Sequence, residues 1–213
     1  MNRVFGWLKT AGYALALSTS FEILYYLINL RAPKSSVNRE PEVDVIFFPD
    51  QKQACDAYFS YGCTNKSCWL SHEETSSMKV KQFIEKTRRS LDICVYCIAS
   101  QTMVDSVLEA HSQGVLVRVV TDQAQASEHS AMVEKLRSSG IEVRTNNSTF
   151  FMHHKFVISD NTQVMTGSFN WSRNAMLGND ENITFIRGEG QITQRYIDEF
   201  EKLWNNYSPE LKS

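Results

Sequence analysis

The residues best suited to chemistry begin at His153, in the stretch HHKFVISD that covers positions 153–160. In a strand, side chains alternate between the two faces. His153 and Lys155 are therefore expected on one face, and His154 and Phe156 on the other. An imidazole beside an ammonium group is a suitable pair for attacking and binding a phosphate. The same alternation predicts a packing or hydrogen-bonding role for His154.

A second polar group follows at Gly167-Ser168-Phe169-Asn170, and Glu181 comes later in the chain. Ser168 and Asn170 can donate hydrogen bonds to phosphate oxygens. Gly167 has no side chain, so the backbone there can approach an anion closely. We expect these groups to bind the same phosphate as Lys155.

The spacing His-x-Lys-x4-Asp-x6-Gly-Ser-x-Asn, from His153 to Asn170, resembles the signature of the phospholipase D superfamily. Members with a single motif build one active site from two copies. This chain has one copy, because none of the other histidines is followed two residues later by lysine. The resemblance thus implies a homodimer with a twofold axis through the catalytic centre.

The family mechanism implied by this resemblance uses His153 twice. His153 of one subunit would attack phosphorus to form a phosphohistidine, and His153 of the other would protonate the leaving oxygen. Lys155 and Asn170 would stabilise charge on the phosphoryl group without a catalytic metal. Glu181 would orient the imidazole, and Asp160 of the motif is interpreted as structural support.

Alternating strand and helix patterns predict an α/β layered sheet, and the resemblance implies the α/β/α mixed sheet of the phospholipase D type. The catalytic domain is expected over residues 43–213. Its strands are expected at 43–48, which is expected to be buried, and at 91–99, 115–121, 141–144, 155–159, 163–166 and 182–186. Its helices are expected at 76–89, 102–113, 130–139 and 192–207, and Gly114 and Gly140 are expected to stop the second and the third.

The N-terminal part differs in composition from this domain. After a short segment, 1–9, residues 10–30 are largely apolar with one charge, and 21 helical residues span about 30 Å, the thickness of a bilayer core. We favour a transmembrane anchor over a cleaved signal peptide or a buried soluble helix. Residues 31–42 are polar with two prolines and are expected to be a linker.

Three of the five cysteines lie between positions 55 and 68, which favours metal binding over a disulfide framework. Cys55, Cys63, Cys68 and His72 form a full tetrahedral zinc set, resembling a CCCH zinc finger at 55–72. Such a zinc would be structural. A zinc-stapled loop is favoured over an RNA contact through Tyr58, Phe59 or Trp69, and unbound cysteines remain a third alternative. Cys94 and Cys97 lie in an apolar strand and are expected to be buried thiols.

Anchor, single motif and CCCH insertion together resemble the mitochondrial phospholipase D family of the Zucchini type, also called mitochondrial cardiolipin hydrolases. The resemblance implies an outer mitochondrial membrane anchor with the catalytic domain in the cytosol. It also implies two activities, single-stranded RNA cleavage in piRNA biogenesis and hydrolysis of cardiolipin to phosphatidic acid. Roles in meiosis, spermatogenesis, differentiation and mitochondrial fusion are associated with them.

Charge does not support a broad nucleic-acid surface. The chain has a net charge of −2, with +4 in residues 1–39 and −6 in the remainder. A polyanion would therefore need a local basic groove. The best basic candidates are Lys79, Lys81, Lys86, Arg88 and Arg89, for which a solvated helix face is the alternative. A nuclease should have its basic groove at the dimer interface, whereas a lipase needs an apolar pocket for acyl chains. We favour a single-stranded nuclease over a lipase, and both over an inactive membrane-tethered scaffold or RNA-binding module.

Overall fold

The computed structural model describes residues 41–207. The expected anchor at 10–30 and most of the linker lie outside the described residues. Within 41–207, no helix has the length and apolar content needed to cross a bilayer. The described part covers residues 43–207 of the catalytic domain that the sequence predicts at 43–213.

One seven-stranded mixed sheet forms the centre of the domain, with strand order β1-β7-β6-β5-β2-β3-β4. The β2–β3 and β3–β4 pairs are parallel and the other four are antiparallel. This confirms the expected mixed sheet. The strands are β1 (Glu42–Phe47), β2 (Ser90–Val95), β3 (Leu116–Thr121), β4 (Glu142–Thr145), β5 (Lys155–Ser159), β6 (Gln163–Gly167) and β7 (Asn182–Arg187).

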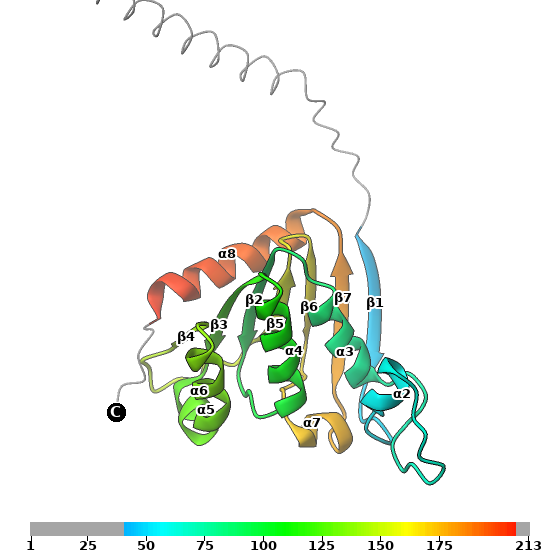
Figure 1. Ribbon diagram of the computed structural model, residues 1–213. Helices are drawn as coiled ribbons and strands as arrows, with labels where there is room; N and C mark the ends of the chain where they lie inside the picture. The colour runs from blue at the N-terminus through cyan, green and yellow to red at the C-terminus, as the bar shows by residue number, and fades with distance from the viewer. Residues whose placement is uncertain (1–40, 208–213) are drawn as a thin grey trace, which may run out of the picture. The chain divides into compact units, whose positions relative to one another are not determined.

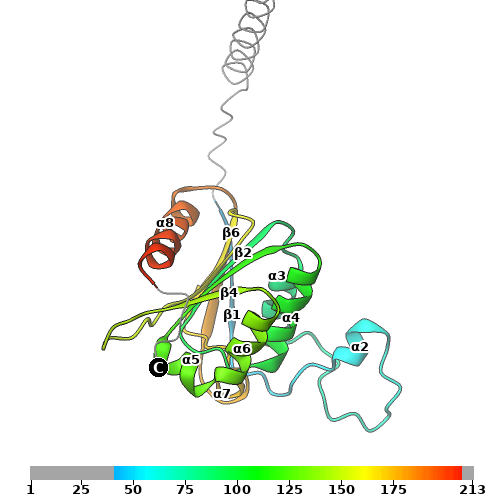
Figure 2. The same cartoon turned by 60° about the vertical axis from the view of Figure 1, so that its left-hand side comes forward.

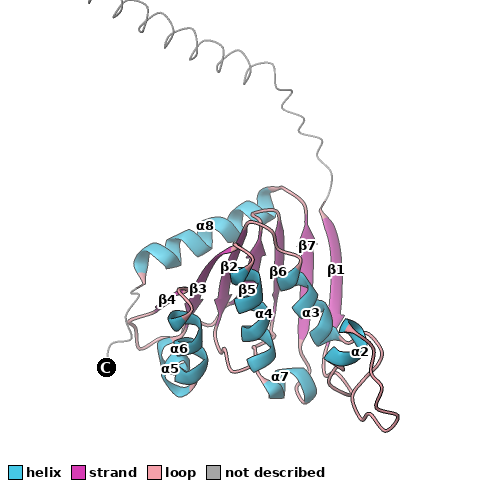
Figure 3. Cartoon of the chain, in the orientation of Figure 1, coloured by secondary structure: helices cyan, strands magenta, loops and turns pink. Residues whose placement is uncertain are grey.

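Helices cover both faces of the sheet. Figure 2 shows α8 on one side and α3, α4 and α6 on the other, and the secondary structure is coloured in Figure 3. Each face has its own buried apolar cluster, one including Phe83 and Val107 and the other Phe156 and Phe200. The domain therefore has three layers. The helices are α2 (Asp56–Ser60), α3 (Ser76–Glu85), α4 (Gln101–Ser112), α5 (Gln123–Glu128), α6 (Ser130–Ser138), α7 (Arg173–Leu177) and α8 (Gln191–Asn206).

Helix α8 is attached to the sheet by more than its apolar face. Arg118 on β3 donates to both carboxylate oxygens of Asp92 at 2.8 and 2.9 Å, and to Glu201 of α8 at 2.6 Å. Its guanidinium also lies 4.8 Å from the centre of the Phe200 ring. These contacts hold α8 along one face of the sheet.

The first strand lies in a different place in the sheet from the one predicted. Residues 43–48 were expected to form a buried strand, but β1 is the edge of the sheet, paired only with β7 (Figure 1). Val43, Val45 and Phe47 share one face of β1 and are exposed, Phe47 by 67%. An apolar run at an edge has the same sequence pattern as one at the centre, so the pattern could not distinguish the two positions.

The end of α3 is also earlier than expected. The helix ends at Glu85 instead of residue 89, because the backbone N–H groups of residues 88–90 donate to the carboxylate of Asp160. Likewise, β2 ends at Val95 and not at residue 99. The short helices α2, α5 and α7 were not expected.

Candidate active site

The motif residues meet at one edge of the sheet. Lys155 begins β5 and pairs with Val95 at the end of β2. Gly167 ends β6 and pairs with Ile183 near the start of β7. Since neighbouring antiparallel strands run in opposite directions, the start of β5 and the end of β6 lie at the same edge. The two parts of the motif are thereby brought together.

His153 and Lys155 share one neighbour, Tyr96, which directly follows β2. The His153 ring centroid lies 4.7 Å from that of Tyr96, and the Lys155 ammonium lies 5.0 Å from it. The ammonium also donates to the carbonyl oxygen of His153 at 2.8 Å. His154 instead packs on Phe156, with centroids 5.6 Å apart. The expected alternation of side chains is confirmed, although β5 begins only at Lys155.

The surroundings of His153 and Lys155 shift the pKa values of both side chains. Partial burial lowers the pKa of His153, and the nearby positive charge of Lys155 lowers it further, while Asp122 acts in the opposite direction. Burial also lowers the pKa of Lys155, against the effect of Glu181. The lowered pKa of His153 favours the neutral imidazole at neutral pH, which is the form that can act as a nucleophile.

The Gly167–Asn170 turn holds its backbone closely against β7. A β-carbon at Gly167 would lie 2.0 Å from the carbonyl oxygen of Asn182. The glycine was expected to make room for an anion, but it makes room for this neighbouring backbone. Ser168 accepts a hydrogen bond from the N–H of Asn182 at 3.1 Å. The Oδ1 atom of Asn170 is buried and has no hydrogen-bond partner among the described residues.

Asp160 is built into the fold. Its carboxylate accepts hydrogen bonds from the backbone N–H groups of Arg88, Arg89 and Ser90. Its own φ is 53°, in the left-handed region that aspartate tolerates better than most residues. This geometry agrees with the interpretation of Asp160 as structural support, since it joins the β5–β6 turn to the start of β2.

Glu181 lies at the edge of the site. Its carboxylate accepts a hydrogen bond from the side chain of Asn179 at 3.0 Å and acts electrostatically on Lys155. Within residues 41–207 it makes no hydrogen bond to His153. The expected orienting contact to the imidazole is therefore not made within one chain.

A pocket of about 490 Å³ opens beside His153, between the start of β5, the end of β6 and the first turns of α8. Its lining combines charged and apolar side chains. The lining residues are His153, His154, Lys155, Phe156, Thr166, Gly167, Ile192, Arg195, Tyr196 and Glu199.

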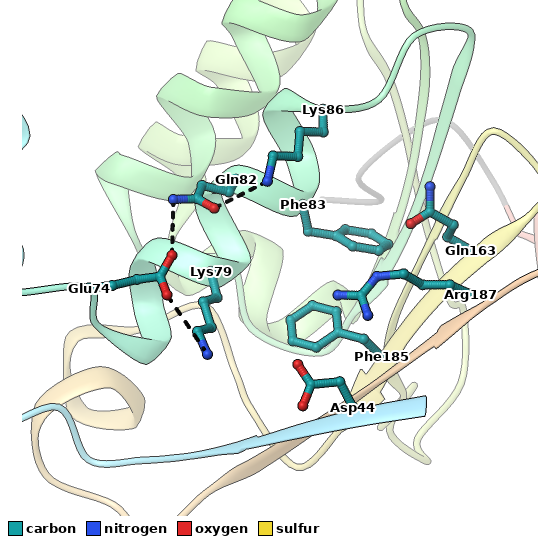
Figure 4. Close-up of a pocket in the computed structure, with 9 residues that line it drawn as sticks. All are labelled: Asp44, Glu74, Lys79, Gln82, Phe83, Lys86, Gln163, Phe185 and Arg187. Atoms are coloured by element: carbon teal, nitrogen blue, oxygen red, sulfur yellow. Dashed lines mark hydrogen bonds and ion pairs between the residues drawn. The ribbon is translucent and has the colours of Figure 1, made fainter. Parts of the chain in front are cut away.

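Two of the basic residues singled out from the sequence line a different pocket. Lys79 and Lys86 contribute to one of about 220 Å³ between α3 and the β1–β7 edge (Figure 4). Lys79 pairs there with Glu74 and Lys86 with Gln82. On the same helix, Lys81 pairs with Glu85 at 2.9 Å.

Arg88 and Arg89 lie just before β2, at the opposite end of that strand from Tyr96. Within the described chain, this run therefore does not line the pocket beside His153. The alternative, a solvated helix face with its own ion pairs, describes Lys79 and Lys81 of α3.

The CCCH residues come together as a metal site would require. The ligand atoms of Cys55, Cys63, Cys68 and His72 all lie within 4.8 Å of one another. The sulfurs of Cys55 and Cys68 are 3.8 Å apart, and tetrahedral zinc with Zn–S bonds of about 2.3 Å would separate them by about 3.8 Å. The Nε2 atom of His72 is buried without a hydrogen-bond partner in the described chain. The cluster fits zinc, and its four protein ligands leave no position for substrate.

The aromatic residues of this insertion have different surroundings. Tyr58 stacks on His72, with ring centroids 4.3 Å apart, so it supports the cluster directly. Tyr61 and Trp69 are 85% and 67% exposed. Cys94 and Cys97 are buried free thiols, as expected, and burial raises the pKa of both.

Sequence reasoning missed three residues of the site. Tyr96 lies inside an apolar run and Arg195 inside an amphipathic helix, so neither had a local signal. Asp122 is buried and accepts a hydrogen bond from the N–H of Met152, directly before the motif. Its position directly after the strand predicted at 115–121 was the one feature of the sequence that could have marked Asp122 as a site residue.

Comparison with known proteins agrees with this geometry. Residues 80–204 match the family described as cardiolipin synthase, PLD-like domain. In its fold, the chain is similar to Nuc of Salmonella typhimurium, a phospholipase D family member, with a TM-score of 0.65, 24% identity and coverage of 79% of this chain and 97% of that one. Fold and motif thus define a phosphodiester hydrolase of the phospholipase D class.

Proteins with similar sequences identify a particular family within this class. The chain is 37% identical over 166 residues to mitochondrial cardiolipin hydrolase of Chlamydomonas reinhardtii, covering 78% of this chain and 74% of the relative. It is 35% identical over 203 residues to mitochondrial cardiolipin hydrolase of Xenopus tropicalis, covering 95% and 91%. The chain belongs to the mitochondrial cardiolipin hydrolase family of the phospholipase D superfamily.

Proposed function

We propose that this chain hydrolyses cardiolipin to phosphatidic acid and phosphatidylglycerol, in an active site shared by two copies. The observation that carries this proposal is the pocket beside His153, where Phe156, Ile192 and Tyr196 supply apolar surface next to the motif. An apolar pocket was the feature expected of a lipase. The names of the relatives support the same substrate.

The reaction proceeds in two steps. A nitrogen of His153 bonds to phosphorus while the phosphorus–oxygen bond to the leaving group breaks, and His153 of the second copy gives its proton to that oxygen. Water then bonds to phosphorus, the phosphorus–nitrogen bond breaks, and the second His153 takes the water's proton. Lys155 and Asn170 bind the phosphate oxygens through their ammonium and amide N–H groups, which are donors.

A dimer is part of the proposal because the described chain holds one motif and leaves the His153 side chain exposed. It also leaves Glu181 without a histidine partner, which a second copy could supply. The expected location is the outer mitochondrial membrane, with a single-pass N-terminal anchor and the catalytic domain facing the cytosol. The relatives' mitochondrial names support the organelle.

The test uses purified full chain with cardiolipin vesicles and with single-stranded RNA, comparing the parent with His153→Asn and with the neighbouring His154→Asn. We expect cardiolipin hydrolysis by the parent and by His154→Asn, and none by His153→Asn. Equal residual activity in all three proteins would instead favour the inactive scaffold. Activity per chain should fall on dilution below the dimer dissociation constant.

Single-stranded RNA cleavage in piRNA biogenesis is the second candidate, with its associated roles in meiosis, spermatogenesis and differentiation. The observation that favours it is the exposed aromatic surface near the site and on the zinc-finger insertion, at Phe150, Phe151, Tyr61 and Trp69, because such rings can stack on bases. Since His153 is the nucleophile, no ribose 2′-hydroxyl is needed. RNA and single-stranded DNA should both give 5′-phosphate ends, and cyclic-phosphate ends would contradict this mechanism.

A further inference from the structure

Helix α8 forms one wall of the active-site pocket. This wall carries the cationic side chain of Arg195, to which the motif assigns no role. Ile192, Arg195, Tyr196 and Glu199 line the pocket and follow one another at the spacing i, i+3, i+4, i+7. Residues at this spacing share one face of a helix. This face is turned toward β5 and β6, so Arg195 opens into the same pocket as His153 and Lys155.

The acidic residue of this wall is already engaged. Glu199 contacts the Nε2 atom of His154 at 3.3 Å and also pairs with Lys202. Arg195 has no ion pair or hydrogen bond within residues 41–207. The pocket therefore contains two cationic side chains, Lys155 and Arg195, and one carboxylate whose charge is offset by its own partners.

Thr166 adds a neutral donor to the lining of the same pocket. The Tyr196 hydroxyl donates to the Thr166 hydroxyl oxygen at 3.2 Å, so the Thr166 hydrogen remains free to donate into the pocket. Apolar surface lies beside it, because the rings of Phe156 and Tyr196 are 5.1 Å apart at their centroids. Donors and apolar rings thus lie side by side.

We propose that Arg195, assisted by Thr166, binds a second phosphate group of the substrate while His153 and Lys155 engage the phosphate that is cleaved. The ligand class is a lipid whose headgroup carries two phosphates joined by a short linker, which is the chemistry of cardiolipin. The inference rests on the proposed lipid function and names the headgroup feature that the pocket recognises. Phe156 and Tyr196 favour a lipid over a nucleic acid as the source of that phosphate.

This subsite accounts for selectivity that the motif cannot provide. The motif contacts one phosphate and would accept any phosphodiester. Arg195 adds a planar donor set that matches a phosphate, and it repels the cationic group of a zwitterionic headgroup. The pocket should therefore prefer cardiolipin to phosphatidylglycerol, and phosphatidylglycerol to phosphatidylcholine.

The experiment compares kcat/KM for cardiolipin and phosphatidylglycerol at equal surface concentration, using the full chain and Arg195→Gln. The ratio of the two values should fall on the order of tenfold in Arg195→Gln, as expected for one lost charge-assisted contact. Lys86→Gln is the matched control, because it removes one positive charge from the α3 pocket of Figure 4. Its ratio should equal that of the parent.

A binding measurement separates this inference from the proposed activity. The inactive His153→Asn chain is titrated with two soluble probes, the fully deacylated headgroup of cardiolipin with two phosphates and glycerophosphoglycerol with one. Tighter binding of the two-phosphate probe, lost on adding Arg195→Gln, supports the subsite even if the parent hydrolyses neither lipid. In that case the proposed lipid function fails alone.

Two results would overturn the subsite. One is an unchanged cardiolipin-to-phosphatidylglycerol ratio in Arg195→Gln together with equal binding of both probes. The other is a loss of single-stranded RNA cleavage in Arg195→Gln with no change in that lipid ratio, which would assign Arg195 to a nucleic-acid phosphate.

Discussion

The ring of His153 packs against the ring of Tyr96, with centroids 4.7 Å apart, and the same Tyr96 ring lies 5.0 Å from the Lys155 ammonium. Tyr96 is itself held on both sides of its backbone. Its N–H donates to the carbonyl of His154 at 2.9 Å, and its carbonyl accepts from the Thr121 hydroxyl at 3.1 Å. One aromatic side chain thus supports both motif residues.

Tyr96 should act as a positioning residue. Tyr96→Leu removes the ring and should lower kcat by about 10- to 100-fold, because misplaced reacting groups lose much of their rate advantage. Tyr96→Phe keeps the ring and should stay within about threefold of the parent, since a cation–π contact needs only the ring face. Single-turnover rates measure both variants. Equal losses in the two would assign the effect to the hydroxyl instead.

His153 and His154 should differ sharply although they are adjacent. His153→Asn should reduce kcat by at least about 10³-fold, because in the proposed mechanism it removes the nucleophile of one copy and the proton donor of the other. Among the described residues, the side chain of His154 contacts Glu199 and Phe156 and not the Tyr96 ring, so the effect of His154→Asn should be at most about tenfold. Steady-state hydrolysis of a common phosphodiester compares them, and equal losses would show that the strand-face assignment is wrong.

The ionisation of His153 should depend on Lys155. Burial and the Lys155 charge both lower the pKa of His153, so the neutral nucleophile persists to lower pH than for a free histidine. Removing the charge in Lys155→Met should raise the His153 pKa toward its ordinary value. NMR titration of the imidazole measures this change, and Lys202→Met serves as the control because Lys202 pairs with Glu199 on α8. A downward shift in Lys155→Met would contradict the electrostatic argument.

Asp160 should matter for stability. Asp160→Ala leaves three backbone N–H groups without their carboxylate, which should lower the free energy of unfolding by about 1–3 kcal/mol. Asp160→Asn keeps a side-chain acceptor and tolerates the positive φ, so it should lose less. Urea unfolding measures both. A loss of activity as large as that of His153→Asn, in a fully folded Asp160→Ala chain, would give Asp160 a catalytic role.

Zinc should stabilise the 55–72 insertion and take no part in the reaction. Purified protein should contain about one zinc per chain, and Cys68→Ser should lose it, because a tetrahedral structural site needs all four ligands. The insertion should then become sensitive to protease. A chelator added during a short assay should leave the hydrolysis rate unchanged. An immediate loss of activity on chelation would place a metal in the reaction.

Much of the catalytic domain followed from local pattern. Gly114 and Gly140, expected to stop two helices, have φ values of 91° and 87°, and α4 and α6 end just before them. A left-handed residue after a helix is a local requirement that glycine meets best. The placement of His153 and Lys155 on one face could be predicted in the same way, since the alternation of side chains needs only an extended backbone.

Features that depend on residues distant in the chain could not be predicted from the sequence. The exposure of Val43, Val45 and Phe47 follows from the position of β1 at the sheet edge, and the early end of α3 follows from Asp160, about 70 residues away along the chain. The lysines of α3 looked available for a polyanion. Their acidic partners come from their own helix and its neighbours, and the catalytic edge lies elsewhere.

The sequence by itself determined the candidate groups for the proposed chemistry, because residue type and spacing specify an imidazole, an ammonium group and a Cys3His set whatever the tertiary structure. Only the tertiary structure decided what surrounds them. Tyr96, Asp122 and Arg195 come from segments far apart in the chain, and the pairing of β2 with β5 and the packing of α8 bring them to His153. Contacts between distant segments leave no trace in local pattern, since they depend on how the strands are ordered in the sheet.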